Sequence, residues 1–164
     1  MHNHQTDYNL EADIRRQFAL EDSDLRTYSP LTLAYIGDGI YELILRTIAV
    51  RQGNRQVNKL HQQTSRYAKA QAQSEMMETL LPLLREEELR VYRRGRNAKS
   101  YTTAKNASVN DYRRATGFEA LMGYLYLDGS TARLLELVKA ALENYTPPER
   151  QGSETRNHKG AEDG

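Results

Sequence analysis

The 164-residue sequence predicts an all-α fold with a single helical domain. Long segments carry helix start and stop signals, no stretch alternates apolar and polar residues as a strand does, and no internal repeat is present. A chain of this length can bury one core of its own. We expect the domain over residues 24–146, after a polar segment (1–23) in which LEADIRRQFAL can form a short helix, and before a disordered polar tail (147–164).

The longest predicted helix begins after Ser29, which caps it, with Pro30 in its first turn, and it ends at Gly53. A second helical region covers residues 55–80, where Gln, Ala, Lys and Glu are frequent, and Pro82 interrupts it. We expect the apolar side chains of this region to point inward; they are Val57, Leu60, Tyr67, Met76, Met77 and Leu80.

The second half of the chain contains three more predicted helices. The segment LREEELRVYRR predicts a short helix that ends at Gly95, and a loop continues to about Val109. A very apolar helix then covers residues 112–127. Ser130 caps a last amphipathic helix, which Pro147 and the proline after it end.

Composition excludes several classes of protein. The chain has no cysteine, so disulfides and thiolate metal sites are excluded. Its apolar stretches are broken well before the roughly 20 residues that a membrane span needs, and the N-terminus has no apolar signal-peptide core. We therefore expect a cytoplasmic protein with no membrane partner. The net charge of +1 indicates no particular ligand.

Each of the two most apolar helices carries an acid in an unusual setting. The stretch AYIGDGIYEL places Asp38 between two glycines, and Glu42 follows one turn later on the same face. In GFEALMGYLYLD, Glu119 lies among large apolar residues. An isolated buried carboxylate costs several kcal/mol, so each acid must meet a cation, a set of hydrogen-bond donors, or water.

Two interpretations of these acids remain open from the residues alone. In one, Asp38 and Glu119 meet at a divalent cation, and oxygen ligands favour Mg²⁺ or Mn²⁺ over zinc. The glycines, at roughly 1 kcal/mol each relative to alanine, would let the helices approach closely or let a substrate backbone reach the acids. In the other, Asp38 accepts hydrogen bonds from a helix N-terminus and Glu119 pairs with Arg46.

Basic residues are concentrated between Arg90 and Arg114, where eight of them face a single acid, Asp111. Asn, Ser and Thr are interleaved with the cations in RRGRNAKSYTTAKNAS. Such a segment suits a polyanion, because Arg and Lys neutralise phosphates while the polar groups donate to phosphate oxygens. The alternatives are a solvated face, or pairing with the glutamates at 86–88.

The two acid-bearing motifs resemble the ribonuclease III catalytic domain. LAYIGDGIYELIL is similar to that family's signature helix, E-x-L-E-F-L-G-D-x-x-L-E-L, and GFEALMGYLYLD to its second motif, D-x-x-E-A-L-x-G-x-x-Y-L-D. The resemblance covers residues 29–145. The short chain and the block RRGRNAKSYTTAKN are similar to the Mini-ribonuclease III subfamily, which has no double-stranded-RNA-binding domain.

The resemblance implies a homodimeric, Mg²⁺-dependent endoribonuclease, with Mn²⁺ as a substitute metal. It implies double-stranded RNA as the substrate, in particular the precursor of the large-subunit (23S) ribosomal RNA whose ends are matured, and a ribosomal protein as a further partner. The apolar circumference of the helix from Pro30 to Val50 also indicates an interface between two copies. The alternative function is a catalytically inactive RNA-binding or ribosome-assembly module on the same fold.

By the same resemblance, Asp38 and Glu119 are the catalytic residues and the metal ligands. The departures from the family pattern remove other acids: Leu31 and Ala34 replace two signature glutamates, and Thr116 replaces the first aspartate of the second motif. Waters would fill the remaining metal positions, as Mg²⁺ tolerates.

We assign supporting roles beside these two acids to Glu42, Thr116 and His61, of which His61 occupies the place of a further family acid. RNA contacts are assigned to the basic segment. The residues expected to contact RNA are Arg94, Arg96, Asn97, Lys99, Lys105, Asn106 and Arg113.

Overall fold

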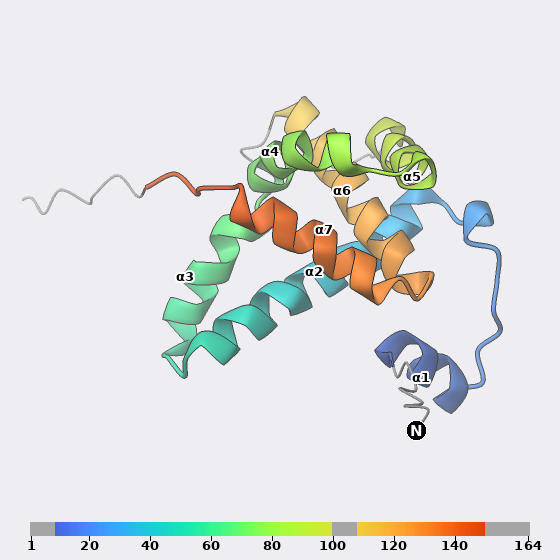
Figure 1. The fold of residues 1–164 in the computed structure, drawn as a ribbon, viewed down its shortest axis with the longest axis horizontal. Helices are drawn as coiled ribbons and strands as arrows, with labels where there is room; N and C mark the ends of the chain where they lie inside the picture. The colour runs from blue at the N-terminus through green and yellow to red at the C-terminus, as the bar shows by residue number, and fades with distance from the viewer. Residues whose placement is uncertain (1–8, 100–107, 150–164) are drawn as a thin grey trace, which may run out of the picture.

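The computed structural model describes residues 9–99 and 108–149. This part of the chain contains seven α-helices, two short 3-10 turns and no strand, which confirms the predicted all-α fold (Figure 1). The elements are α1 (Leu10–Gln17), η1 (Leu25–Thr27), α2 (Pro30–Gln52), α3 (Val57–Ala68), α4 (Ala70–Leu80), η2 (Leu81–Leu83), α5 (Glu86–Asn97), α6 (Val109–Leu127) and α7 (Thr131–Glu143). None of these helices is long and apolar enough to cross a bilayer.

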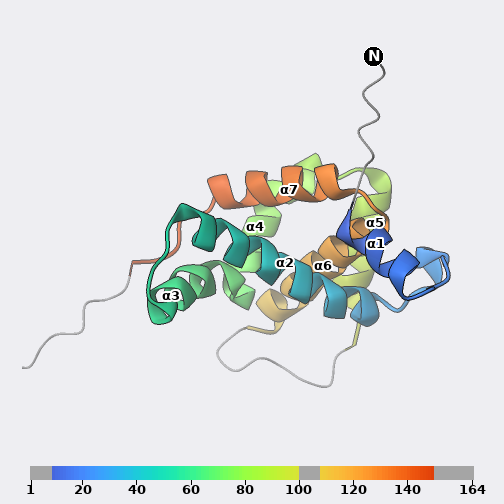
Figure 2. The same cartoon turned by 90° about the horizontal axis from the view of Figure 1, so that it is seen from below.

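The core forms where the two longest helices, α2 and α6, cross (Figures 1 and 2). Helices α4 and α5 both pack on α6, and α7 packs on α4 and α6. The rings of Tyr41 on α2 and Phe118 on α6 meet edge to face, with their centroids 4.9 Å apart. The Tyr41 hydroxyl donates a 2.7 Å hydrogen bond to the Tyr67 carbonyl, which ties the end of α3 to this core.

Two glycines allow α2 and α6 to approach so closely. A Cβ atom on Gly37 would lie 1.7 Å from the Glu119 carbonyl oxygen, and one on Gly123 would lie 1.9 Å from the Leu33 carbonyl oxygen. Both distances are far below van der Waals contact, so any side chain at either position would force the helices apart. The absence of these two side chains therefore sets the distance between the helices that carry the acids.

The first half of the chain follows the predicted boundaries closely, with two corrections. The Ser29 hydroxyl accepts a hydrogen bond from the Leu31 N–H, and Gly53 follows the last residue of α2, as expected. The region 55–80 is divided at Lys69, whose extended backbone (φ −65°, ψ 149°) ends α3 and turns α4 onto α6. The prediction that Val57 points inward is wrong, because it begins α3 and is 78% exposed.

Helix α5 is longer than the sequence indicated. It continues through Gly95 and ends at Asn97, so the prediction that Gly95 stops the helix is wrong. A Cβ atom on Gly95 would lie 2.8 Å from the Gly117 Cα and from the Ala120 Cβ of α6. Gly95 therefore allows α5 and α6 to approach closely. Arg94, Arg96 and Asn97 accordingly belong to a helix instead of the predicted loop.

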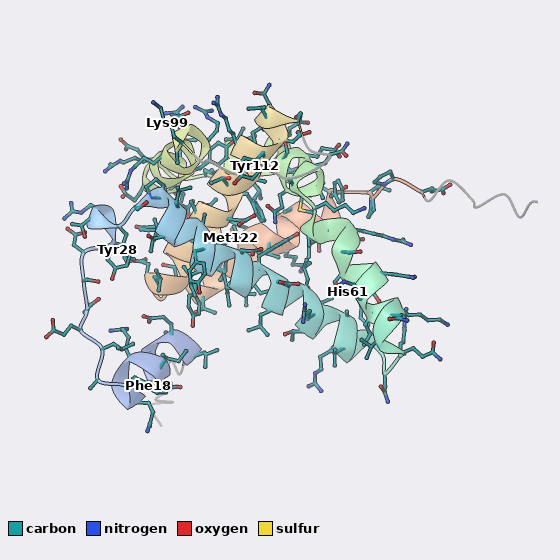
Figure 3. All side chains as sticks on the ribbon, turned by 180° about the vertical axis from the view of Figure 1, so that it is seen from behind. Phe18, Tyr28, His61, Lys99, Tyr112 and Met122 are labelled. Carbon is teal, nitrogen blue, oxygen red and sulfur yellow. The ribbon has the colours of Figure 1, made fainter. Side chains whose placement is uncertain are left out.

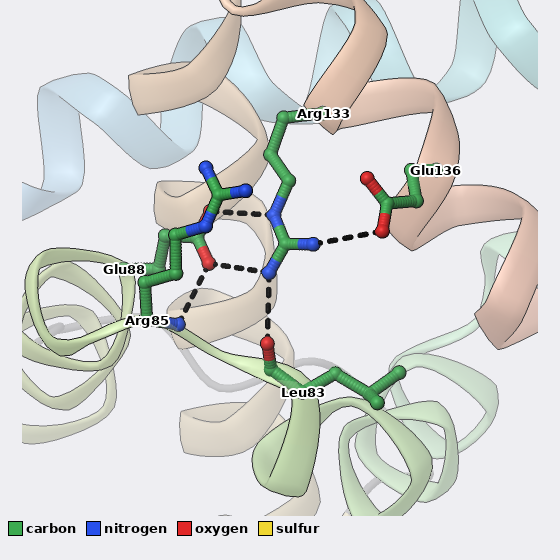
Figure 4. Close-up of polar contacts among 5 residues, drawn as sticks. All are labelled: Leu83, Arg85, Glu88, Arg133 and Glu136. Carbon is green, nitrogen blue, oxygen red and sulfur yellow. Dashed lines mark hydrogen bonds and ion pairs between the residues drawn. The ribbon is translucent and has the colours of Figure 1, made fainter.

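A buried ion pair fixes the start of α5 against α7 (Figure 4). The Arg133 guanidinium donates to both Glu88 carboxylate oxygens, at 2.8 and 2.9 Å, and to the Leu83 carbonyl oxygen at 2.8 Å. Glu88 also accepts the Arg85 N–H at 2.8 Å. Burial acts to raise the pKa of Glu88, but the hydrogen bonds from Arg133 and Arg85 outweigh it and lower the pKa. This network holds α5, and with it a row of arginines, in place.

The polar N-terminal segment contains α1, whose start is capped by the Asn9 side chain through a 2.7 Å hydrogen bond from the Ala12 N–H. Figure 1 shows α1 beside the rest of the domain, joined to α2 by a long connection that includes η1. Residues 150–164, most of the predicted disordered tail, lie outside the described residues.

Candidate active site

Asp38 and Glu119 lie at the crossing of α2 and α6. Gly37 precedes Asp38 and touches the backbone of Glu119, so the contact between the helices brings the two acids into one neighbourhood. Asp38 is exposed to solvent, whereas Glu119 is largely covered by the surrounding helices. The pair therefore has one carboxyl group open to a ligand and one held deeper in the domain.

The environment of both carboxyls disfavours their charged forms. Burial and, to a smaller extent, the charge of Asp38 together raise the pKa of Glu119 to about 8, against a smaller lowering effect from the Gln73 side chain. Burial and the nearby charge of Glu42 raise the pKa of Asp38. Neither acid forms an ion pair with any residue in 9–99 or 108–149. The site thus brings two acidic groups together with no counter-charge from the part of the chain that the structure describes.

The interpretation that Glu119 pairs with Arg46 is wrong. Arg46 instead donates a 2.8 Å hydrogen bond to Glu42, one turn earlier on α2. The Asp38 side chain accepts no hydrogen bond from a helix N-terminus within the described part of the chain. The interpretation in which the two acids meet at a divalent cation stays a prediction.

The donor set fits a divalent cation with an oxygen preference. Two carboxylates supply a charge of −2 and only oxygen ligands, which suits Mg²⁺ or Mn²⁺ with water in the other positions. Among the residues that the structure describes, no three His, Cys, Asp or Glu side chains gather closely enough to hold a metal ion. That Asp38 and Glu119 are the metal ligands stays a prediction from the sequence, in which they would be the only two carboxylates at the ion.

The three residues assigned beside the acids have different surroundings. Glu42 shares the Asp38 face of α2 and pairs with Arg46. The Thr116 hydroxyl donates a 3.0 Å hydrogen bond to the Tyr112 carbonyl of its own helix. His61 is exposed on α3, far from Lys99 in Figure 3, and its side chain has no hydrogen bond or ion pair with a described residue. Of the three, only Glu42 is seen to act on a site acid.

Three of the predicted RNA-contacting residues, Arg94, Arg96 and Asn97, lie on α5. Arg94 donates a 3.2 Å hydrogen bond to the Tyr28 carbonyl, and with Asn97 it lines a hollow on the outer face of α5. Arg96 lies over the ring of Tyr92, 5.7 Å from its centroid. Two residues apart on a helix, Arg94 and Arg96 face different directions, so they are not one tight cation cluster. Neither pairs with the glutamates at 86–88.

The other predicted RNA contacts lie beyond α5. Lys99 is exposed after the end of α5, where Figure 3 shows many nitrogen-tipped side chains around it. Arg113 is exposed in the first turns of α6. Lys105 and Asn106 lie outside the described residues.

A second basic surface was not predicted from the sequence. Arg55, Lys59, Arg66 and Lys69 are exposed on and beside α3, and none pairs with an acid that the structure describes. Lys59 and Arg66 are seven residues apart and share a face of the helix. The sequence has no acid between Glu42 and Glu75, and this absence could have revealed the second basic surface.

The raised pKa of Glu119 predicts how stability depends on pH in the metal-free protein. Because the folded chain keeps a proton on Glu119 up to about pH 8, whereas the unfolded chain loses it near the ordinary value of 4.5, the free energy of unfolding should fall between these pH values. Glu119→Gln removes this loss and should be more stable than the wild type by about 2–4 kcal/mol at pH 8.

Urea unfolding in EDTA at pH 5 and pH 8 measures this difference. Glu143→Gln, which changes an exposed glutamate on α7, serves as the control and should retain the wild-type pH dependence. An identical pH dependence in the wild type and in Glu119→Gln would show that Glu119 ionises normally.

Comparison with known proteins places this geometry in a family. The Ribonuclease III domain model matches residues 31–130. A Mini-ribonuclease 3 of Clostridium tetani is 45% identical over 149 residues, which cover 88% of this chain and 97% of that protein. A Mini-ribonuclease 3 of Brevibacillus brevis is 50% identical over 113 residues, 69% of this chain and 84% of that protein.

The fold has a solved counterpart as well. The crystal structure of protein FN1578 from Fusobacterium nucleatum superposes with a TM-score of 0.67 and 27% identity, covering 74% of this chain and 98% of that one. The acidic crossing of α2 and α6 lies within the matched domain, at residues 38 and 119. The chain therefore belongs to the ribonuclease III family, in its Mini-ribonuclease 3 group, and is an endoribonuclease.

Proposed function

We propose that this endoribonuclease cleaves double-stranded RNA with Mg²⁺ held by Asp38 and Glu119, and that its substrate is the precursor of 23S ribosomal RNA. The observation that carries the proposal is the pair of carboxyls at the α2–α6 crossing, with which no cation in residues 9–99 or 108–149 forms an ion pair. Ribonuclease III enzymes generally depend on a divalent metal and act on double-stranded RNA, which supports both choices. Mn²⁺ has the same oxygen preference and should substitute.

In this proposal, the residues of the site have different roles. Bound Mg²⁺ would act as a Lewis acid toward the scissile phosphate and lower the pKa of an attacking water. Asp38 presents its carboxylate at the surface, where a phosphate can approach. Glu119 would be the second ligand, and it would have to lose its proton to bind the ion. Arg46, already paired with Glu42, does not compete for either acid.

Two basic surfaces can hold a duplex against this site. RNA double helices are recognised through shape, phosphates and 2′-hydroxyls, for which flexible cations and amides are suited. The residues on α5 and after it (Arg94, Arg96, Asn97 and Lys99) form one such surface, and the cations of α3 form another. A cytoplasmic location and a ribosomal protein partner stay predictions from the sequence.

Asp38→Asn should abolish cleavage while leaving folding and RNA binding intact. The change keeps the shape of the side chain and removes a metal-binding charge, so the rate should fall by far more than tenfold, each factor of ten being about 1.4 kcal/mol of barrier. Cleavage of a uniform RNA duplex with and without Mg²⁺ measures the effect, and Glu143→Gln is the matched control on an exposed acid. Retention of a tenth of the wild-type rate would refute the assignment and favour another catalytic site.

Neutralising Arg94, Arg96 and Lys99 together should weaken binding to every duplex sequence alike. The slope of log affinity against log salt should become shallower by about one unit for each phosphate that the variant no longer neutralises. A control triple variant neutralises Arg16, Arg26 and Lys139, exposed cations that are paired with acids and lie on other elements. Equal slopes in the two variants would show that α5 is not the RNA-binding surface.

We also propose that two copies associate through the exposed face of α2. Tyr35 is 83% exposed there, and Leu31 and Leu43, one turn before and two turns after it, are 39% and 49% exposed. An apolar row of this kind on the helix that carries Asp38 suits a two-fold interface, which would give one duplex two active sites.

Tyr35→Asp should convert the dimer to a monomer in sedimentation at micromolar concentration, because it places a charge in the apolar row. The control is Val57→Asp, which alters an equally exposed apolar residue on α3 and should remain dimeric. A monomeric wild type under these conditions would refute the interface.

A further inference from the structure

The hollow on the outer face of α5 is lined by more basic side chains than acidic ones. The charged and amide residues that line it are Glu86, Arg90, Arg93, Arg94 and Asn97. They recur at intervals of three and four residues, so they share one face of the helix. The opposite face of α5 packs on α6, which leaves this face turned toward solvent.

The three arginines of the hollow differ in what they already contact. Arg90 forms a 3.0 Å ion pair with Glu87, so its charge is compensated by the same helix. Arg94 gives one N–H to the Tyr28 carbonyl and keeps its other donors. Arg93 is exposed, and no described residue forms an ion pair or a hydrogen bond with its side chain. Of the three, Arg93 therefore has the most freedom to bind an anion.

Arg96 fixes the orientation of the Asn97 side chain. The Arg96 Nε–H donates a 3.3 Å hydrogen bond to Asn97 Oδ1. An arginine can only donate, so the oxygen of the amide must face Arg96, and the amide nitrogen stays available as a donor. The Arg96 guanidinium is itself held over the Tyr92 ring, 5.7 Å from its centroid, and the residue is half-buried. Because Asn97 lines the hollow, its amide nitrogen can donate to a ligand there.

We propose that Arg93, Arg94 and Asn97 form a subsite that binds a backbone phosphate of duplex RNA, and that Arg96 is a positioning residue for the Asn97 amide. Two guanidinium groups and an amide provide the positive charge and the donors that phosphate oxygens accept. Arg93 thereby joins the RNA contacts, and Arg96 acts through Asn97 instead of touching RNA itself. The competing explanation is a solvated basic face that holds no phosphate. The proposal rests on the proposed function, because it takes duplex RNA as the ligand.

Arg93→Gln tests the subsite, because it removes a charge that no described acid compensates. The slope of log affinity for an RNA duplex against log salt should become shallower by about one unit. In cleavage, the KM should rise while kcat stays unchanged, since the phosphate that Arg93 binds is not the one that is cleaved. The melting temperature should match the wild type, because Arg93 is exposed.

Arg90→Gln is the matched control. Arg90 lines the same hollow about one turn before Arg93, but its charge is already paired with Glu87. This variant should keep the wild-type salt slope and KM. An equal change in both variants would show a general effect of net charge instead of a subsite. That result, or an unchanged slope in Arg93→Gln, would overturn the proposal.

A double-mutant cycle tests the role of Arg96. Asn97→Ala should raise the KM without changing the salt slope, because the amide is neutral. Arg96→Met removes the donor to Asn97 but keeps a long side chain over Tyr92, and alone it should raise the KM to a similar extent. In the Asn97→Ala protein, Arg96→Met should have no further effect on KM or salt slope. A further rise in KM there would show that Arg96 contacts RNA directly and would overturn its positioning role.

The triple variant at Arg94, Arg96 and Lys99 separates failure of the subsite from failure of the proposed function. A shallower slope in the triple variant beside an unchanged slope in Arg93→Gln would refute the role of Arg93 and leave α5 as an RNA-binding surface. Wild-type slopes in both variants would refute α5 as an RNA-binding surface altogether.

Discussion

The close crossing of α2 and α6 is the constraint on which the rest of the structure depends. Gly37 and Gly123 allow carbonyl oxygens of the opposite helix to occupy the space where side chains would otherwise stand. Asp38 directly follows the first glycine, and Glu119 lies one turn before the second, so tight packing at this point also brings two like charges together. A core normally avoids such a pair, and local rules of folding are most often broken at functional sites. The same geometry that stabilises the domain by packing therefore produces its strongest electrostatic conflict.

Glu88 is a buried acid with a structural role, and its environment can be compared with that of Glu119. Glu88, almost fully buried, receives both arms of the Arg133 guanidinium and a backbone N–H, and its pKa is lowered. Glu119 lies in the same helical domain, where burial and the neighbouring charge of Asp38 raise its pKa to about 8. No cation in the described part of the chain pairs with Glu119, so the two acids have opposite environments within one domain. A strongly raised pKa of this kind marks Glu119 as a candidate for a functional site.

The sequence contained enough to predict the fold class, the ends of α2 and the two acids, because capping residues and the Gly-Asp-Gly motif are local signals. It did not predict that the helical region 55–80 is divided at Lys69, because neither glycine nor proline marks the break between α3 and α4. Gly95 was misread as a helix end, since its role is a tertiary contact with Gly117 that no local pattern reveals.

The two acids of the α2–α6 crossing lie apart from the basic residues of α5 and α3. The chain carries nearly equal numbers of basic and acidic residues, yet the cations of α5 and α3 do not reach Asp38 or Glu119. On α5, the Glu88–Arg133 pair and the buried Gly95 fix the helix, so its outward arginines keep their places at a distance from the acids (Figure 4). If one of these arginines could reach the α2–α6 crossing, it would pair with Glu119 and compete with a cation for the carboxylates. Under the proposed function, basic surfaces held on helices away from the α2–α6 crossing would leave the acids free for a metal ion and the arginines free for phosphates.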